Sequence, residues 1–249
     1  MPHKPMIFLV LTLVATNALA APQTIVGPAA RVSVMELYTS EGCDSCPPAE
    51  HWLSGFTADK RLWKELVPLA FHVTYWDDLG WKDPFDSRAY TLRQQLLALR
   101  AGSGNVYTPE FVLNGAEWQN WFNHWPLQLP DPVKVGSVSL AAEGRRVRVH
   151  FAPAAARKDI LEAHVVLLAF GVAVHVGAGE NAGAVLDHDF LVLSLSDSPM
   201  VAKDGGYETE LTLPASGVRA GRYGLAAWIS SANDPTPIQA AGGWLDSAP

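Results

Sequence analysis

The chain has 249 residues, of which 49% are hydrophobic and 17% charged, and this composition excludes a disordered or fibrous protein. Its 18 basic and 25 acidic residues give a net charge of −7, and an acidic chain without large basic clusters is a poor ligand for nucleic acids and anionic membranes. The length is compatible with one large domain or two modest ones.

The first twenty residues have the pattern of a secretory signal peptide. Lys4 precedes the apolar run Met6–Val14, and Ala18-Leu-Ala20 is a cleavage motif of small residues. The apolar run is short for a membrane-spanning helix, which needs about 20 apolar residues. We therefore expect residues 1–20 to be removed near Ala20. The mature protein is then expected to be secreted or periplasmic, without stable membrane insertion.

Strand-like and helix-like stretches alternate between residues 31 and 130. Residues 31–38 and 66–74 predict two strands, and a helical stretch from residue 49 to about residue 60 lies between them. Residues 87–100 predict an amphipathic helix rich in leucine, and residues 111–113 predict a third strand. The alternation predicts an α/β sheet with crossover connections, in a domain that spans residues 24–130.

The pattern changes after Pro130-Asp-Pro132. Residues 133–151 contain two alternating runs around Glu143-Gly144, which predict a hairpin. Further short β-rich runs follow, separated by turn residues, and they cover residues 163–176, 190–195, 207–213 and 223–229. This spacing predicts a β-rich, sandwich-like second domain over residues 133–249.

The chain has two cysteines, Cys43 and Cys46. Export would place them in an oxidising compartment, where the pair tends to form a disulfide. Structural zinc sites usually need four ligands, and a second cysteine pair that could complete such a site is missing. Covalent attachment of haem would need a histidine directly after the second cysteine, where this chain has Pro47. No metal or organic cofactor is therefore expected. A structural disulfide closing so short a loop contributes only about 2 kcal/mol. Thiol–disulfide exchange explains the spacing better, and the structural role stays as the alternative.

The position of the pair, between a predicted strand and a predicted helix, suggests roles for the two sulfurs. Unpaired amides at a helix N-terminus favour a thiolate, so we expect Cys43 to attack and Cys46 to resolve the mixed disulfide. The negative charge of Asp44 disfavours the thiolate form of the neighbouring cysteines. Pro47-Pro48 shift the expected start of the helix toward Cys46. We therefore expect a reducing pair, with a potential well below the about −120 mV of the strongest periplasmic oxidants.

A proline lies at the start of the third predicted strand, in Val106-Tyr-Thr-Pro-Glu110. This is where thioredoxin-like folds hold a cis proline beside the disulfide. We expect a cis Pro109, with Tyr107 and Thr108 beside it to bind a substrate polypeptide. The alternative is an ordinary trans proline at an edge strand, since only about 5–6% of such bonds are cis.

Four segments of the chain resemble an uncharacterised family of secreted bacterial proteins, named after domain of unknown function 1223. The segments are residues 34–50, 71–85, 106–109 and 179–188. The resemblance implies an exported protein with a thioredoxin-like N-terminal fold, and it implies no reaction. The sequence departs from that fold at residues 116–130, which are short and rich in tryptophan.

Three further residues are candidates for the site. Glu36 lies in the predicted strand before the cysteines, where a buried carboxyl could accept the proton of Cys46. The alternative is a carboxylate satisfied by amides or a cation. Trp76 and Trp81 follow the second predicted strand, where they either form a substrate groove beside the disulfide or seal the core.

These patterns favour thiol–disulfide exchange on exported protein thiols or disulfides, with an unknown redox partner. The first alternative is a copper chaperone, in which His51, His72 or His124 would join the two cysteines. Such chaperones usually separate their cysteines by three residues, so the spacing here does not favour it.

A second alternative is a binding module in which the C-terminal region recognises a partner and the disulfide is inert. Glu180, Asn181, Asp187 and His188 would then be of interest. A hydrogen-bonded turn is the simpler interpretation of these four residues.

Overall fold

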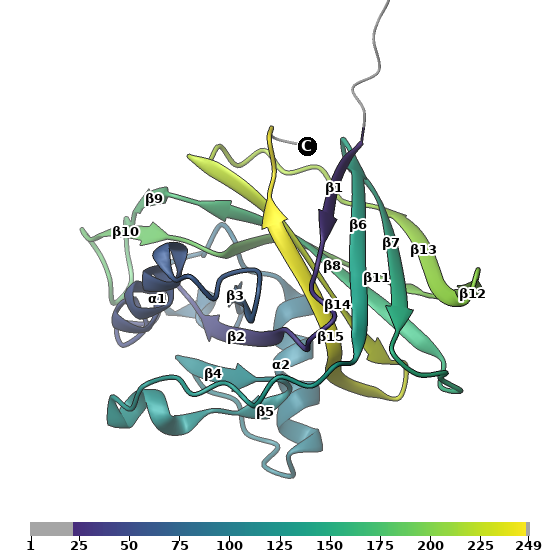
Figure 1. Ribbon diagram of the computed structural model, residues 1–249. Helices are drawn as coiled ribbons and strands as arrows, with labels where there is room; N and C mark the ends of the chain where they lie inside the picture. Colours follow the sequence, from purple (N-terminus) through teal and green to yellow (C-terminus); the bar gives the residue numbers. More distant parts are fainter. Residues whose placement is uncertain (1–21, 248–249) are drawn as a thin grey trace, which may run out of the picture.

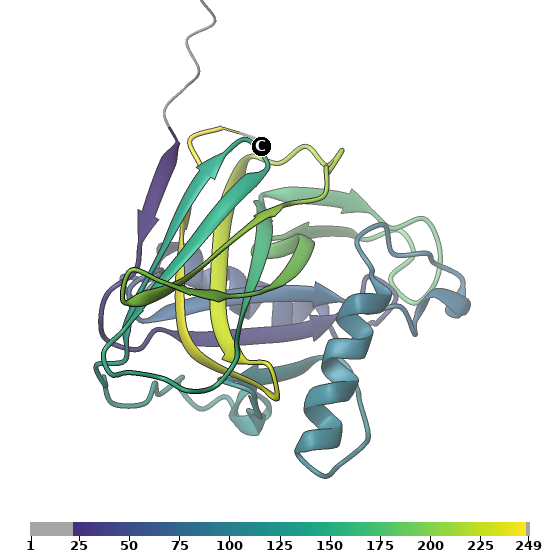
Figure 2. The same cartoon turned by 90° about the vertical axis from the view of Figure 1, so that its right-hand side faces the viewer.

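The computed structural model describes residues 22–247 (Figures 1 and 2). The predicted signal peptide lies outside this range. In the described range the helices are α1 (Pro47–Ser54) and α2 (Arg88–Arg100). The strands are β1 (Gln23–Val26), β2 (Ser33–Thr39), β3 (Leu66–His72), β4 (Glu110–Leu113), β5 (Ala116–Glu117), β6 (Gly136–Glu143), β7 (Arg146–Pro153), β8 (Leu161–Phe170), β9 (Val172–His175), β10 (Val185–His188), β11 (Leu191–Pro199), β12 (Val201–Lys203), β13 (Gly206–Thr212), β14 (Arg222–Ser231) and β15 (Asp234–Trp244).

The strands form three sheets within the described residues. An eight-stranded mixed sheet has the order β15-β14-β8-β11-β3-β2-β4-β5, and a five-stranded antiparallel sheet has the order β1-β6-β7-β13-β12. The third sheet is the ribbon β9–β10, which lies beside α1 (Figure 1). Helix α2 contacts β3 and stands at the lower right of the molecule in Figure 2.

The α/β thioredoxin-like class expected for the N-terminal part is wrong. The described chain is mostly β, with 45% of it in strands and 15% in helices. Strand–helix alternation is present up to β4, but β5, a short 3₁₀ helix at Gln119–Asn123 and an irregular segment follow it. Strand β3 has β2 on one side and pairs in parallel with β11 on the other, at Ala70 and Leu191. The sheet therefore continues into strands from late in the chain.

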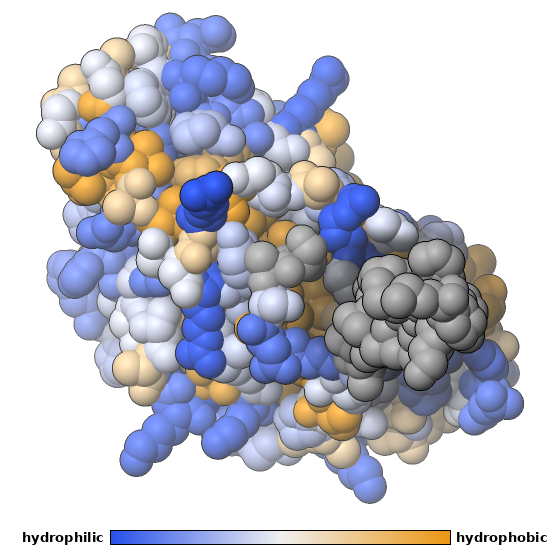
Figure 3. Space-filling view, turned by 90° about the horizontal axis from the view of Figure 1, so that it is seen from above, coloured by the Kyte–Doolittle hydropathy of each residue, from blue (hydrophilic) through white to orange (hydrophobic). Residues whose placement is uncertain are grey.

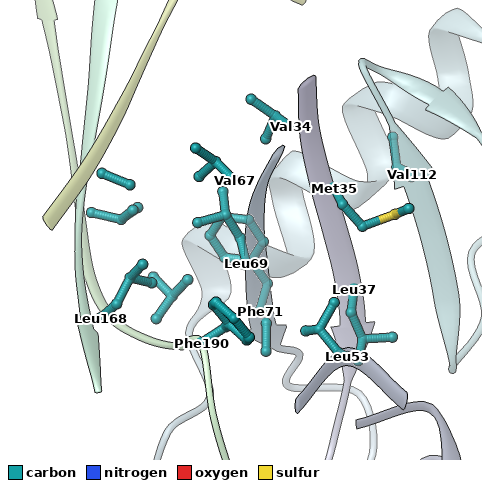
Figure 4. Packing of buried hydrophobic residues seen from close by; sticks show 14 of the residues in the cluster. Val34, Met35, Leu37, Leu53, Val67, Leu69, Phe71, Val112, Leu168 and Phe190 are labelled. Atoms are coloured by element: carbon teal, nitrogen blue, oxygen red, sulfur yellow. The ribbon is translucent and has the colours of Figure 1, made fainter. Parts of the chain in front are cut away.

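Strands β2 and β3 are apolar runs because both faces of the sheet are covered where they lie. All seven residues of each strand are buried. The two strands pair in parallel, and the connection between them contains α1. Their side chains pack with Leu53 of α1, Val112 of β4, and Leu168 and Phe190 from late in the chain (Figure 4). One core therefore joins the two parts of the sequence.

Strand β8 connects this core to a second one. Successive side chains of a strand point to opposite faces, and Val166, Leu168 and Phe170 lie in the first core. Val165 and Leu167 lie in the second core, which the five-stranded sheet covers. The strands of that sheet alternate buried and exposed residues because only one face is covered.

The surface seen from above is largely polar, with smaller apolar groups between (Figure 3). None of the helices described is long and apolar enough to cross a membrane.

Candidate functional site

The two cysteines form a disulfide in the turn that leads from β2 into α1. Both cysteines have 0% of their surface exposed, whereas Asp44 and Ser45 between them are exposed. The disulfide therefore lies directly below the surface, with its sulfurs turned inward.

The predicted effect of the two prolines on the helix is confirmed. Cys46 is the N-cap residue of α1, and Pro47 is the first helical residue, where its fixed φ suits the helix. The prolines carry no amide hydrogen, and the amides of Ala49 and Glu50 donate to the carbonyl oxygen of Cys46 at 2.9 and 3.1 Å. The helix thus presents few free amides to a thiolate.

Residues 176–184, which connect β9 to β10, lie over this turn and are called the covering loop below. The side-chain amide of Asn181 donates to the carbonyl oxygens of Glu41 and Cys43, both at 2.9 Å. The backbone amide of Asp44 donates to the Glu180 carboxylate at 3.2 Å. The covering loop therefore fastens directly to the cysteine turn.

Trp81 supports the covering loop from below. A Cβ atom at Gly179, whose φ is +75°, would lie only 3.1 Å from the Trp81 side chain. The indole Nε1 of Trp81 donates to Oε2 of Glu41 at 2.7 Å. Trp81 was expected either to line a substrate groove or to seal the core, and these contacts favour a packing role under the covering loop.

Trp76 connects the cysteine turn to the predicted proline site. Its indole Nε1 donates to Oγ1 of Thr108 at 2.7 Å, and a Cβ atom at Gly42 would lie 3.0 Å from the Trp76 side chain. The Thr108–Pro109 bond is cis, which confirms the prediction for that bond. The Tyr107 hydroxyl donates to Glu117 of β5.

Glu36, the predicted proton acceptor, forms a buried ion pair. Its carboxylate accepts from Nε and Nη2 of Arg93 at 2.7 and 2.8 Å and from the Tyr38 hydroxyl at 2.7 Å. The Arg93 guanidinium also lies 4.6 Å from the ring centre of Trp228. The carboxylate is therefore satisfied by a cation and a hydroxyl. Its catalytic role stays a prediction.

A second buried cluster lies between the cysteine turn, α1 and β10. His188 Nδ1 lies 2.5 Å from Glu50 Oε2, and His188 Nε2 lies 3.0 Å from Glu41 Oε1. His72 Nδ1 lies 2.7 Å from Asp83 Oδ2. The rings of the two histidines are 5.1 Å apart. All five residues are at most 7% exposed.

Charge pairing within the cluster shifts the pKa values of its members. Burial acts to lower the pKa of His188, but the Glu50 and Glu41 carboxylates outweigh it and raise this pKa to about 10. Burial acts to raise the pKa of Asp83, but His72 and backbone amides lower it to about 2. The pKa of Glu50 is lowered, because His188 outweighs the effect of burial.

The cluster also offers metal ligands. Glu50, His72 and His188 each bring one ligand atom to within 4.8 Å of the others. Of the histidines considered for copper, His51 and His124 are exposed, whereas the cysteine sulfurs are buried.

The sequence alone does not reveal this cluster, because its members come from three separate segments of the chain. His188 was considered only for a binding module, and Glu50 and Asp83 were not singled out. The signal was the resemblance itself, since three of its segments contain Glu41, Glu50, His72, Asp83 and His188.

Residues 34–230 match the model of a family described as "Protein of unknown function (DUF1223)". The chain belongs to this family. No protein of curated function matches the chain.

Two solved structures resemble that of this DUF1223 protein. The X-ray crystal structure of protein AGR_C_4864 from Agrobacterium tumefaciens has 25% sequence identity and a TM-score of 0.58, and the match covers 85% of this chain and 94% of that one. HBP35 of Porphyromonas gingivalis has 17% identity and a TM-score of 0.61, over 89% of this chain and 77% of that one. At this identity, the second likeness concerns the fold alone.

Proposed function

We propose that this protein is exported and performs thiol–disulfide exchange on protein thiols or disulfides through Cys43 and Cys46. The observation that carries the proposal is the position of the disulfide. It lies in a surface turn whose two intervening residues are exposed, beneath a loop that is fastened by side-chain hydrogen bonds.

The electrons and protons of the exchange balance when a partner dithiol acts as the reductant. A partner thiolate attacks Sγ of Cys43, the Cys43–Cys46 bond breaks, and Cys46 leaves as a thiolate. A second partner thiolate then attacks the partner sulfur of the mixed disulfide and releases Cys43. The partner loses two electrons and gains a disulfide, and the pair becomes a dithiol. The reverse sequence reduces a partner disulfide.

The proton for the leaving thiolate has a source in the buried cluster. Glu50 follows Cys46 by four residues on α1, so the two lie on the same side of the helix. Glu50 is paired with His188, whose raised pKa keeps it protonated at neutral pH. We assign the proton exchange to this pair in preference to Glu36, which is paired with Arg93.

Burial of the sulfurs sets a condition on the mechanism. An attacking sulfur must approach the disulfide directly, so the covering loop has to open first. Three hydrogen bonds fasten it to the cysteine turn, and each contributes a net stabilisation of about 1 kcal/mol. Opening that costs about 3 kcal/mol leaves roughly one molecule in 150 open, which is ordinary for local opening of a loop.

Catalysed reduction of insulin disulfides by dithiothreitol tests the proposal. The wild-type protein should accelerate the reaction, and Cys43→Ser should remove the acceleration. Cys46→Ser should accumulate mixed disulfides on Cys43, because the resolving thiol is missing. Ser45→Ala removes a hydroxyl that lies 3.4 Å from Cys43 Sγ but removes no sulfur, and it should retain most of the activity. Equal rates for the wild type and Cys43→Ser, with both folded by circular dichroism, would contradict the proposal.

A further inference from the structure

We propose that Glu50, His72 and His188 form a binding site for a divalent transition-metal ion of the Zn²⁺ type. The three residues come from α1, β3 and β10, and their ligand atoms lie within 4.8 Å of one another in the interior. Two histidines and one glutamate are a ligand set of catalytic zinc sites, which keep a fourth position for water or substrate. The site does not use the cysteines, but it shares Glu50 and His188 with the proton exchange proposed above, so a bound ion would take the place of the proton between them.

Each histidine has the support that a metal ligand needs. Metal-binding histidines usually give their second ring nitrogen to a carboxylate, which fixes the ring and its tautomer. His72 has Asp83 on Nδ1 at 2.7 Å, and His188 has Glu41 on Nε2 at 3.0 Å. These contacts leave Nε2 of His72 free, and Nδ1 of His188, which lies 2.5 Å from Glu50 Oε2, would bind the ion after losing its proton.

The supporting carboxylates are themselves held in place. Asp83 accepts from the backbone amide of Glu41 at 2.8 Å, and Glu41 accepts from Trp81 at 2.7 Å. The ligand Glu50 accepts from the Thr39 hydroxyl at 2.6 Å. This outer layer matches the hydrogen-bonded surroundings of metal ligands.

Nε2 of His72 is the atom that points to a missing ligand. The residue is 0% exposed, and this nitrogen has no hydrogen-bond partner among the described residues. An unsatisfied buried polar group is costly, so such an atom calls for an occupant. A metal ion would bind the free lone pair of Nε2 once Nδ1 donates its hydrogen to Asp83.

The spacing requires modest side-chain movements. Ligand atoms about 2.0–2.1 Å from a tetrahedral zinc ion lie about 3.3 Å apart. The ligand atoms here lie within 4.8 Å of one another, so the longer separations would shorten. His188 Nδ1 and Glu50 Oε2 are at 2.5 Å in the structure, so this separation would lengthen as the ion replaces the hydrogen bond.

A cavity borders this cluster at Glu50. A cavity of about 400 Å³ lies between α1 and β10 and is lined by Glu50, His51 and Asp187, among others. Glu50 borders both this cavity and the buried histidines, so an ion can pass by its carboxylate.

Isothermal titration with Zn²⁺ tests the site. The full chain is kept oxidised, so that no thiolate binds metal, and is freed of metal with a chelator. We expect one Zn²⁺ per chain. His72→Gln and His188→Gln should weaken binding by at least about 100-fold, and Asp83→Asn by about 10- to 100-fold. His164→Gln is the matched control, because His164 is also buried and paired with a carboxylate, Asp197, but lies outside the cluster. It should bind like the wild type.

A second measurement covers variants that fail to fold. In the unaltered chain, Zn²⁺ should shift the imidazole ¹⁵N resonances of His72 and His188 and leave that of His164 in place. The proposal is overturned if the wild type binds no ion, if folded His72→Gln binds as tightly as the wild type, or if the ¹⁵N resonances of His72 and His188 stay unchanged with Zn²⁺. A bound water on His72 is then the simpler occupant.

Discussion

Replacing Asn181 by alanine should accelerate reduction of the disulfide about 30-fold. Asn181 supplies two of the three hydrogen bonds that fasten the covering loop to the cysteine turn. At a net contribution of about 1 kcal/mol each, their loss lowers the free energy of opening by about 2 kcal/mol. If the loop opens before the attack, the reduction rate rises by the same factor as the population of molecules with an open loop. Because about 1.4 kcal/mol corresponds to a tenfold change, about 2 kcal/mol corresponds to about 30-fold.

The assay follows reduction by excess dithiothreitol, with free thiols trapped by a maleimide and counted by mass spectrometry. Asn114→Ala is the control, because Asn114 also makes two hydrogen bonds, to Val34 and Ser33, but lies at the β4–β5 turn. It should destabilise the whole fold and change the reduction rate by less than about twofold. An Asn181→Ala rate within twofold of the wild type would refute the argument that the covering loop controls access.

Three further predictions concern the groups around the site. Arg93→Met leaves Glu36 as an unpaired buried charge and should lower the free energy of unfolding by about 3–5 kcal/mol, and adding Glu36→Gln should recover part of the loss in urea unfolding. Trp81→Phe removes the donor to the buried Glu41 carboxylate and should cost about 1–3 kcal/mol in the same assay. Burial raises the pKa of Glu110 from 4.5 to about 7, so the folded state holds this proton more tightly than the unfolded state. The contribution of Glu110 to the free energy of unfolding is therefore fully present below pH 4.5 and is lost as the pH rises through about 7. Glu110→Gln should flatten this pH dependence, and an unchanged slope would contradict the assignment.

Local sequence patterns predicted most of the strands and both helices, because alternation and apolar runs depend on neighbouring residues. Strand β15 was missed, since Asn233, Asp234, Pro235 and Pro237 indicate a turn. The structure tolerates these prolines because β15 is an edge strand of the eight-stranded sheet.

The predicted amphipathic helix α2 exists, but of its four leucines only Leu97 belongs to the buried face. Leu92, Leu96 and Leu99 are 51%, 45% and 69% exposed, whereas Arg93 and Gln94 are buried. The buried polar residues bind the carboxylates of Glu36 and Glu110 in the sheet. Hydrophobic periodicity cannot detect a polar face whose partners are distant in sequence.

The fold class and the buried cluster could not be predicted for a related reason. The pairing of β3 with β11 joins residues more than a hundred positions apart, and no local pattern specifies it. His188 likewise meets Glu41 and Glu50 only because β10 lies against α1. The cysteine pair was predictable from its spacing, whereas the cis Pro109 was predicted from the position that thioredoxin-like folds give such a proline.

The most direct test of the central claim is the dependence of the disulfide reduction rate on urea, measured below the unfolding transition. Reduction through local opening of the covering loop exposes little surface, so the rate should be nearly independent of urea. If the rate instead rises with the full slope of global unfolding, the disulfide reacts only in the unfolded chain. The pair would then be a structural disulfide, and exchange in the native fold would be contradicted.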